Sequence, residues 1–228
     1  MPSNSPLRLV VFDCDGTLVD SQRTIVAAMA KAFESENLLP PGAGAVRRVI
    51  GLSLHDAVAH LAPGHDSDRY ERLVATYRST HPQALADHAG SEAAYPGARD
   101  SLQALARAGY VLGVATGKGR RGLVATLERH RLDGFFATLQ TADFNAGKPH
   151  PEMLCRAMDE TGIGPHETVF VGDSVYDMEM AVNAGVAGIG VSRGYHPPAD
   201  LRRAGAGGIA KTFAGLPGLV QQTMDSTA

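Results

Sequence analysis

Two aspartates separated by one residue follow a short apolar run near the start of the chain. Asp13 and Asp15 stand directly after Leu9–Phe12, and Gly16 permits the sharp bend that would bring both carboxylates into one crevice. A like charge raises the pKa of one of two neighbouring carboxylates, so the pair can take opposite roles. Asp13 would stay ionised as a nucleophile, while Asp15 would protonate a leaving alkoxide and later take a proton from water. An isolated pair of this kind is also typical of an Asx turn or a helix cap.

Two further groups of polar residues stand after this motif and have the chemistry to hold a phosphate. Thr116 follows the apolar run 111–115, and its hydroxyl and the backbone N–H groups from Gly117 onward would bind phosphate oxygens at a helix start. Threonine is also a common N-cap residue, so this signal is weak by itself. Lys148 would offset negative charge on a transferring phosphoryl group, although alone it would be an ordinary surface lysine. We predict phosphate-binding roles for Thr116, Gly117 and Lys148, and catalytic roles for Thr116 and Lys148.

A last group of polar residues predicts a magnesium site. Asp173 closes another apolar run, and Asp177 lies one helical turn later on the same face. Magnesium prefers a few carboxylates and retains several waters. We expect Asp13 and Asp173 to bind Mg²⁺ together with the phosphate, and Asp15 to add its backbone carbonyl. Asp177 would lie behind these ligands and orient Lys148 or a metal-bound water, unless it is only a first-turn acid that interacts with the helix dipole.

These residues must be positioned by the elements that precede them. Short apolar runs with β-branched residues predict buried strands of a parallel sheet, and helix-like segments between them predict an α/β, Rossmann-like, doubly wound fold. Ligands of such sheets bind beyond the carboxyl ends of the strands, so the polar residues should converge. The predicted strands are 9–12, 111–115, 135–139, 169–171 and 186–191, and the helices are 98–108, 119–131, 151–161 and 176–184.

One long segment interrupts the alternation of strands and helices. Residues 21–94 contain helical stretches at 24–37, 54–61 and 68–81 without a convincing buried strand. We interpret this segment as a small helical cap domain inserted after the first strand. The catalytic core would then consist of residues 1–20 and 95–228, with an edge strand near 205–209 and a closing helix.

The bulk composition excludes several classes of protein. Of the 228 residues, 44% are hydrophobic and 20% charged, and the net charge is -3, so no global field favours nucleic acid or an anionic membrane. Cys14 and Cys155 are too few for a disulfide framework or a cysteine-based zinc site, and the nine histidines are scattered. No apolar stretch has the length of a membrane span, and the start of the chain is unlike a signal peptide. We expect a cytoplasmic monomer or homodimer.

Taken in order, the four groups of residues resemble the motifs of the haloacid dehalogenase superfamily of phosphohydrolases. The resemblance covers nearly the whole chain and implies an aspartyl-phosphate intermediate at Asp13, a Rossmann-like core and a helical cap after the first motif. Within the superfamily, the chain most resembles phosphoglycolate phosphatase-like members, which often carry Asn where this chain has Gly117. The residues that carry the resemblance are Asp13-Cys14-Asp15-Gly16-Thr17-Leu18-Val19-Asp20, Thr116, Lys148-Pro149, Gly172-Asp173-Ser174 and Asp177, and for the subgroup Asp20-Ser21, Ile50-Gly51-Leu52 and Tyr95-Pro96-Gly97.

Asp15 favours one reaction within that superfamily. The resembling dehalogenases and phosphonate hydrolases lack an aspartate at this position, since neither protonates an alkoxide leaving group. We therefore predict a phosphatase that hydrolyses a small phosphate monoester, with a phosphoglycolate-type substrate as the first choice. A phosphomutase acting on a sugar phosphate would share both aspartates. A non-catalytic phosphate-binding module would be expected to lack Asp13, Asp15 or Asp173, and all three are present.

The choice of substrate is expected to depend on the cap. Arg47 and Arg48 are candidates for presenting positive charge to an acidic substrate, and the alternative is a solvated helix face. Lys118 and its basic neighbours Arg120 and Arg121 are expected to be mostly solvated, although Lys118 could reach the substrate. Phosphoglycolate, sugar phosphates, nucleoside monophosphates and pyrophosphate all fit the phosphate site alone.

Overall fold

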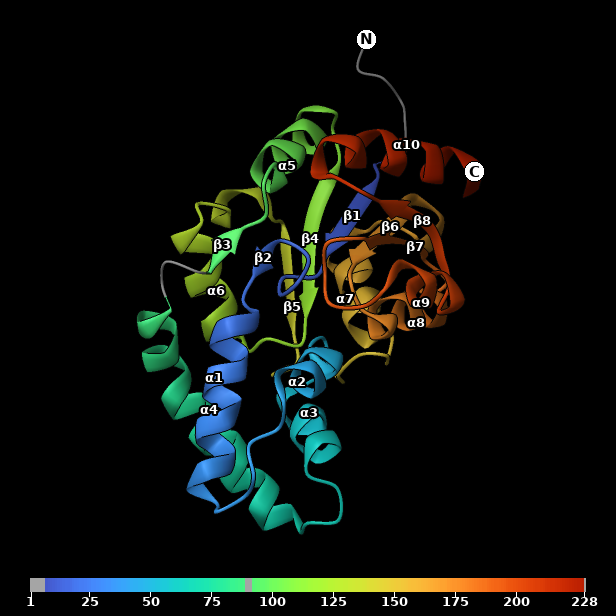
Figure 1. Ribbon diagram of the computed structural model, residues 1–228. Coiled ribbons are helices and arrows are strands. Elements are labelled where there is room, and N and C mark those ends of the chain that lie inside the picture. The colour runs from blue at the N-terminus through green and yellow to red at the C-terminus, as the bar shows by residue number, and fades with distance from the viewer. Residues whose placement is uncertain (1–6, 89–91, 228) are drawn as a thin grey trace.

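The computed structural model describes residues 7–88 and 92–227, so the predictions for the first six residues and for 89–91 lie outside it. Six strands form the central sheet: β1 Leu9–Phe12, β4 Val111–Thr116, β5 Thr138–Thr141, β6 Thr168–Gly172, β7 Ala187–Val191 and β8 Ala206–Ala210. Their order is β5-β4-β1-β6-β7-β8, and every neighbouring pair is parallel (Figure 1). This confirms the predicted α/β fold. Strands β1 and β6 are buried at every position, which explains why their sequences do not alternate with exposed polar residues.

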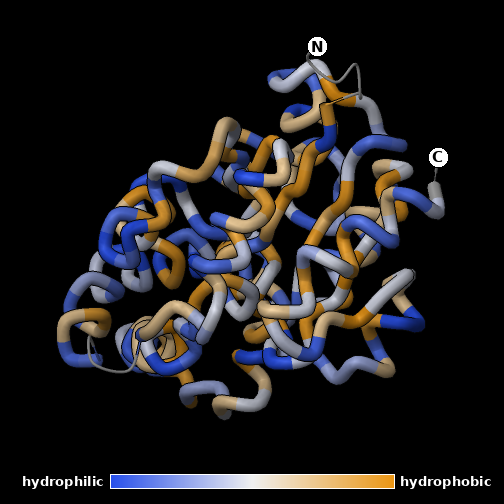
Figure 2. Tube along the Cα trace, turned by 90° about the horizontal axis from the view of Figure 1, so that it is seen from above, coloured by the Kyte–Doolittle hydropathy of each residue, from blue (hydrophilic) through white to orange (hydrophobic). Residues whose placement is uncertain are grey.

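Helices cover both faces of the sheet, because successive side chains of a strand point to opposite sides. Val10 and Phe12 belong to a hydrophobic cluster with residues of three helices, α5 Ala98–Arg107, α6 Arg120–Arg129 and α10 Leu216–Thr227. Leu9 and Val11 belong to a second cluster with residues of α7 Glu152–Thr161, α8 Val175–Asn183 and α9 Pro198–Arg203. Figure 2 shows hydrophobic segments in orange running through the interior between these layers.

A helical cap follows the first strand, as predicted. Its helices pack around a separate hydrophobic cluster that includes Met29, Phe33, Val58 and Leu73. In Figure 1 the cap lies below the sheet, on the side where β1 and β4 end. Its elements are α1 Gln22–Ser35, α2 Ala43–Val49, α3 Leu54–Leu61 and α4 Ser67–Asp87.

Both ends of the cap meet in a small sheet that the sequence pattern did not predict. Strand β2, Val19–Asp20, pairs antiparallel with β3, Ala93–Ala94. Two-residue strands are too short to produce a periodic pattern, and only the pairing of distant residues defines them. The pairing supports the proposed division at residues 20 and 95, although those boundaries stay a prediction.

Two predicted elements differ most in extent from the structure. The strand expected at 135–139 is wrong in its position along the chain, because Asp133–Phe135 forms a 3-10 helix and β5 starts at Thr138. Phe135 and Phe136 are apolar because they pack against the first cluster, not because they pair in the sheet. Helix α4 continues beyond the predicted end at residue 81 and accommodates Pro82 in its interior. Within residues 7–88 and 92–227, no helix has both the length and the apolar character needed to cross a membrane.

Candidate active site

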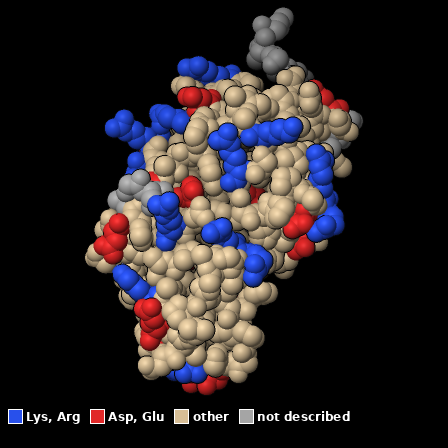
Figure 3. Space-filling view, in the orientation of Figure 1, with Lys and Arg blue, Asp and Glu red and all other residues tan. Residues whose placement is uncertain are grey.

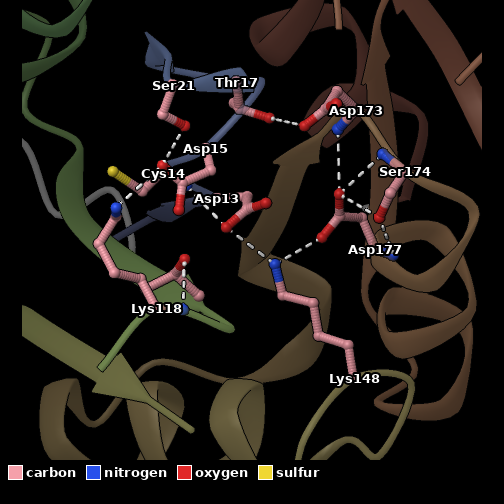
Figure 4. A network of polar contacts seen from close by, with 11 residues as sticks. Asp13, Cys14, Asp15, Thr17, Ser21, Lys118, Lys148, Asp173, Ser174 and Asp177 are labelled. Atoms are coloured by element: carbon pink, nitrogen blue, oxygen red, sulfur yellow. Dashed lines mark hydrogen bonds and ion pairs between the residues drawn. The ribbon is translucent and has the colours of Figure 1, made fainter. Parts of the chain in front are cut away.

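Asp13 lies at the carboxyl end of β1 with its two carboxylate oxygens in different surroundings. Oδ1 accepts hydrogen bonds from the backbone N–H of Cys14 at 2.7 Å and pairs with Lys148 Nζ at 2.9 Å (Figure 4). Oδ2 is buried and has no hydrogen-bond partner among the described residues. Burial raises the pKa of Asp13 to about 7, against the opposing effect of Lys148. The free oxygen is therefore the one available to a metal ion or to phosphorus.

Lys148 is buried between two carboxylates. Its Nζ atom lies 2.9 Å from Asp13 Oδ1 and 2.6 Å from Asp177 Oδ1. Burial would lower the pKa of Lys148, but the two carboxylates outweigh it and raise the pKa above its ordinary value, so the ammonium stays charged. The structure thus places Lys148 in the constellation, and the alternative of an ordinary surface lysine is wrong.

Asp177 supports this arrangement from the first turn of α8. Its Oδ2 atom accepts hydrogen bonds from the backbone N–H of Asp173 at 3.0 Å and from the N–H and hydroxyl of Ser174, both at 2.8 Å. Ser174 and Asp177 form a reciprocal capping box, because the serine hydroxyl also accepts from Asp177 N–H. Both carboxylate oxygens of Asp177 are thus engaged, which agrees with the predicted role of orienting Lys148.

Asp173 faces Asp13 across the ends of β1 and β6. Thr17 donates its hydroxyl to Asp173 Oδ1 at 2.9 Å, and Tyr195 donates its backbone N–H to Oδ2 at 2.8 Å. Burial raises the pKa of Asp173 well above its ordinary value, and the charges of Asp177 and Asp13 raise it further. The loops around it approach so closely that a Cβ atom at Gly16 would lie 2.4 Å from Asp173 Oδ2. Gly16, at φ +86°, therefore serves both the predicted bend and the space for this carboxylate.

The buried carboxylates have the composition of a divalent cation site. Oxygen atoms of Asp13, Asp173 and Asp177 all lie within 4.8 Å of one another. Lys148 is the one ammonium group that forms ion pairs with these three among the described residues, so negative charge remains in excess. Together with the unpartnered Asp13 Oδ2, this excess fits a hard cation with oxygen ligands. Asp177 pairs with the Lys148 ammonium through Oδ1, whereas Asp13 keeps Oδ2 free and Asp173 has no ion pair among the described residues, so Asp13 and Asp173 are the better candidates for direct ligands.

Asp15 is directed toward a different part of the site. Its Oδ1 atom accepts a hydrogen bond from the hydroxyl of Ser21 at 2.5 Å and pairs with Lys118 Nζ at 3.1 Å. Figure 4 shows Lys118 on one side of the two aspartates and Lys148 on the other. The carboxylate of Asp15 is thus separate from the three that could hold a metal ion. Its predicted backbone contact with that ion stays a prediction.

Lys118 is a functional candidate whose environment was predicted incorrectly. Its side chain is only 9% exposed, whereas a mostly solvated charge was expected. Burial would lower its pKa, but Asp15 and other nearby groups raise it above the ordinary value. The one available signal was its position two residues after Thr116, at the carboxyl end of a central strand. That position gave no indication that the carboxylate of Asp15 pairs with Lys118.

Asp13, Asp15, Thr116 and Gly117 line one cleft of about 870 Å³ between the core and the cap. Thr116 ends β4 and is buried, and its hydroxyl accepts a long hydrogen bond of 3.3 Å from the backbone N–H of Lys118. The structure therefore brings together the residues predicted to hold phosphate and those predicted to react with it. Much of the opposite wall is apolar and comes from the cap: Ile25, Met29, Val46, Val49, Leu52 and Leu54.

The basic residues of the cleft are not the ones predicted from the cap sequence. Arg47 and Arg48 are exposed, and α2 presents Val46 and Val49 to the cleft in their place. The hypothesis that the two arginines face the substrate is therefore wrong, because they lie on the solvent side of a short amphipathic helix. Figure 3 shows several basic side chains at the level where the core meets the cap. The arginine and lysine residues that line the cleft are Arg78, Lys118, Arg121 and Arg129.

Comparison with known families agrees with this geometry. A family model described as haloacid dehalogenase-like hydrolase matches residues 10–191, which include all of the site residues described above. The chain belongs to the haloacid dehalogenase-like hydrolases. The family resemblance predicted from the motifs is thereby confirmed.

Several relatives of this haloacid dehalogenase-like hydrolase are phosphatases by name. The probable phosphatase IndB of Dickeya dadantii is 36% identical over 212 residues, covering 92% of both chains. A phosphoglycolate phosphatase of Pseudomonas putida is 33% identical over 83% of this chain and 71% of the relative. The pyrophosphatase PpaX of Bacillus mycoides is 29% identical over 82% of this chain and 84% of the relative. The predicted likeness to phosphoglycolate phosphatases is confirmed, and relatives with another named substrate match as well.

The fold is also that of solved haloacid dehalogenase-like structures. The crystal structure of a predicted phosphoglycolate phosphatase from Haemophilus somnus 129pt has a TM-score of 0.84 and 24% sequence identity. The match covers 96% of this chain and 100% of that chain. It shows that the core and the cap of this hydrolase follow a known architecture.

Proposed function

We propose that the chain is a magnesium-dependent phosphatase that hydrolyses a small phosphate monoester through an aspartyl-phosphate at Asp13. The observation that carries this proposal is the pair of unlike carboxylates at one end of β1. Asp13 has a buried oxygen without a partner, and Asp15 is directed to the cleft where a leaving group would lie. Mg²⁺ would be held by Asp13 and Asp173, and it would neutralise charge on the phosphoryl oxygens.

The first step would transfer the phosphoryl group to the enzyme. A carboxylate oxygen of Asp13 attacks phosphorus, the bond between phosphorus and the ester oxygen breaks, and the leaving alkoxide takes a proton from Asp15. The ammonium of Lys148 and the N–H groups after Thr116 would stabilise charge on the phosphoryl oxygens. Lys148 is suited to this role because two carboxylates hold it in place and keep it charged.

The second step would release phosphate. A water molecule attacks phosphorus and gives its proton to the Asp15 carboxylate, and the bond between phosphorus and Asp13 breaks. The products are inorganic phosphate and the original carboxylate of Asp13, with Asp15 protonated for the next cycle. The apolar wall of the cap would limit the access of other water molecules during both steps.

A phosphoglycolate-type ester is the substrate class that we favour. The 33% identity to a phosphoglycolate phosphatase supports it, and so do the basic residues that line the cleft, because they suit a substrate with a second anionic group. A panel of phosphate esters, ranked by kcat/KM, tests this choice. Phosphoglycolate should rank first, and a higher rank for pyrophosphate or a nucleoside monophosphate would refute the substrate assignment alone.

The reaction itself is tested with the generic substrate p-nitrophenyl phosphate. Release of phosphate should require Mg²⁺ and should be abolished by Asp13→Asn, which keeps the size of the side chain but removes the nucleophile. Asp100→Asn is a matched control, because Asp100 lies in the first turn of α5, away from the cleft lining. Equal activity of the wild type and Asp13→Asn would contradict the proposed mechanism.

A further inference from the structure

The cap loop formed by residues 50–53 lies directly against the phosphate-binding loop of the core. A Cβ atom added to Gly117 would be 2.2 Å from the carbonyl oxygen of Leu52 and 2.9 Å from that of Gly51. Both neighbours are backbone atoms, so they cannot rotate away as a flexible side chain would. The cap loop can therefore occupy this position only because residue 117 has no side chain.

Two more glycines show that the cap loop contacts the core at more than one place. A Cβ atom at Gly147 would lie 3.0 Å from Ser53 Cβ, and one at Gly51 would lie 2.8 Å from Ser174 Oγ. Gly51 also has φ +109°, which a residue with a side chain rarely adopts. The loop thus meets three separate core loops, each of which follows a strand of the sheet.

Two side chains of the core hold the end of the adjoining cap helix. The carbonyl oxygen of Arg48, in the last turn of α2, accepts a hydrogen bond from the hydroxyl of Tyr176 at 3.2 Å, and His196 Nε2 lies 3.2 Å from it. The backbone N–H of Val175 donates to His196 Nδ1 at 3.3 Å, so the imidazole proton is on Nε2 and can be donated to Arg48. The rings of Tyr176 and His196 pack edge to face with centroids 5.8 Å apart, which orients both donors.

The position of the cap loop decides how much space lies above the phosphate site. Residues 50–54 line the cleft together with Asp13, Thr116 and Gly117. A substrate phosphate at Asp13 would therefore have its first carbon atoms between the cap loop and the core. The remaining volume of the cleft extends along α4 and α6, where the lining residues include Tyr77 and Ala125.

We propose that Gly117 is a specificity-determining residue, and that Tyr176 and His196 are positioning residues that hold the cap loop over the phosphate site. This close roof selects primary phosphate esters, in which an unbranched CH₂ group follows the ester oxygen, over esters of secondary alcohols. More distant parts of the substrate can still extend into the wider cleft. The inference rests on the proposed phosphatase activity and specifies the substrate class for the same site.

Two isomeric substrates test the selection. Glycerol 1-phosphate is a primary ester and glycerol 2-phosphate a secondary ester of the same composition and charge. The wild type should prefer the primary ester, and Gly117→Ala should reduce the ratio of the two kcat/KM values by about tenfold or more, a size typical of one misfitted carbon group. A loss of kcat/KM that affects both substrates equally cancels in this ratio. Ala at position 117 also keeps the backbone N–H that would bind the phosphate. Gly134→Ala is the control, because a Cβ atom there meets nothing within 4 Å.

A second measurement tests the position of the loop without relying on activity. Tyr176→Phe removes a hydroxyl bond between core and cap, whereas Tyr70→Phe removes a hydroxyl bond of 3.0 Å to Ala62 within the cap. Hydrogen exchange in the segment 49–54 should become faster in Tyr176→Phe and Gly117→Ala. It should stay unchanged in Tyr70→Phe and Gly134→Ala.

These outcomes separate the inference from the proposed function. If the wild type hydrolyses phosphate esters but Gly117→Ala and Gly134→Ala show the same isomer ratio, the inference is overturned and the function stands. If exchange in Tyr176→Phe equals that in Tyr70→Phe, the positioning role is overturned. If the wild type releases no phosphate from any ester, the proposed function fails, and the exchange experiment still decides whether Gly117 and Tyr176 seat the loop.

Discussion

At the scale of single residues, neighbouring carboxylates differ because their partners differ. Asp13 is next to a buried ammonium and has one free oxygen, while Asp15 interacts with a hydroxyl and with Lys118 at the cleft. One residue of separation and a glycine bend are enough to place them in these two environments. The two carboxylates therefore lie in different surroundings, as the proposed division into nucleophile and proton donor requires.

We expect Asp15→Asn to affect the two chemical steps unequally. With p-nitrophenyl phosphate the leaving group needs little protonation, so formation of the phosphoenzyme should be largely retained. Hydrolysis of the phosphoenzyme should slow by about 10²–10⁴-fold, because no base takes the proton of water. Rapid mixing should then show a burst of p-nitrophenol close to one equivalent of enzyme, and a linear time course without a burst would contradict the role of Asp15.

Removal of the buried ammonium should damage both stability and activity. Lys148→Met leaves the carboxylates of Asp13 and Asp177 close together without their shared cation, and breaking a buried ion pair costs about 3–5 kcal/mol. Urea denaturation without added metal measures this loss. Lys211→Met, at an exposed position, should change the free energy of unfolding by less than about 0.5 kcal/mol. Similar values for the two variants would contradict the buried pairing.

At the scale of elements, each strand end delivers its functional residue through a specific local structure. Strand β6 ends at Gly172, and α8 begins at Val175 behind the capping box of Ser174 and Asp177. The box fixes the carboxylate of Asp177, which in turn pairs with Lys148. A helix cap and the orientation of Lys148, the lysine proposed to act in catalysis, are thus one structural unit.

Ser174→Ala tests this coupling of cap and site. Loss of the N-cap hydroxyl should lower the free energy of unfolding by about 1 kcal/mol, and kcat should fall as well, because Asp177 loses a hydrogen bond that orients it. Asp66→Ala removes the side-chain cap of α4 and should cost similar stability. Since α4 starts far along the cap from Asp177, that control should leave kcat unchanged. Equal kcat values for the two variants would show that the box is only structural.

At the scale of the whole molecule, the site lies where the cap and the core meet. The core has two hydrophobic clusters and the cap has its own. Contacts between the two parts are concentrated in a few places, including the paired linkers β2 and β3 and the loop at residues 50–53. The cap can therefore contribute one wall of the site without sharing the core of the catalytic domain.

The excess of buried negative charge should make stability depend on both pH and magnesium. The folded state raises the pKa of Asp13 to about 7 from an ordinary value of 3.8 and raises that of Asp173 as well. At pH values between 3.8 and about 7, the folded state binds more protons than the unfolded state. Without metal, these carboxylates therefore make the protein less stable as the pH rises through this range. Mg²⁺ should therefore increase the melting temperature more at pH 8 than at pH 5.5.

Thermal unfolding at the two pH values, with Mg²⁺ and with a chelator, measures this difference. Asp173→Asn removes one of the proposed ligands and one of the buried charges. This variant should unfold at a higher temperature than the wild type in chelator at pH 8, and its response to Mg²⁺ should be smaller. An equal Mg²⁺ effect at both pH values in the wild type would contradict the proposed site.

Much of the fold and most of the site follow from local sequence. Short apolar runs that end in Asp13, Thr116 and Asp173 predict parallel strands, and parallel strands bring their carboxyl ends to one edge. Lys148 was predicted from its place in the same series. The predicted strands and the convergence of these residues are confirmed because they depend on periodicity within a segment and on a general property of open parallel sheets, whereas the catalytic roles stay predictions.

Other features were decided only by the tertiary structure. The burial of Lys118 against Asp15, the exposure of Arg47 and Arg48, and the close approach of Leu52 to Gly117 all depend on how the cap packs against the core. The residues in each contact are far apart in sequence, and no periodic pattern relates them. The sequence by itself therefore determined which residues are available for the proposed phosphate chemistry, because one sheet edge gathers those residues. The shape of the substrate space was decided by packing between two parts of the chain.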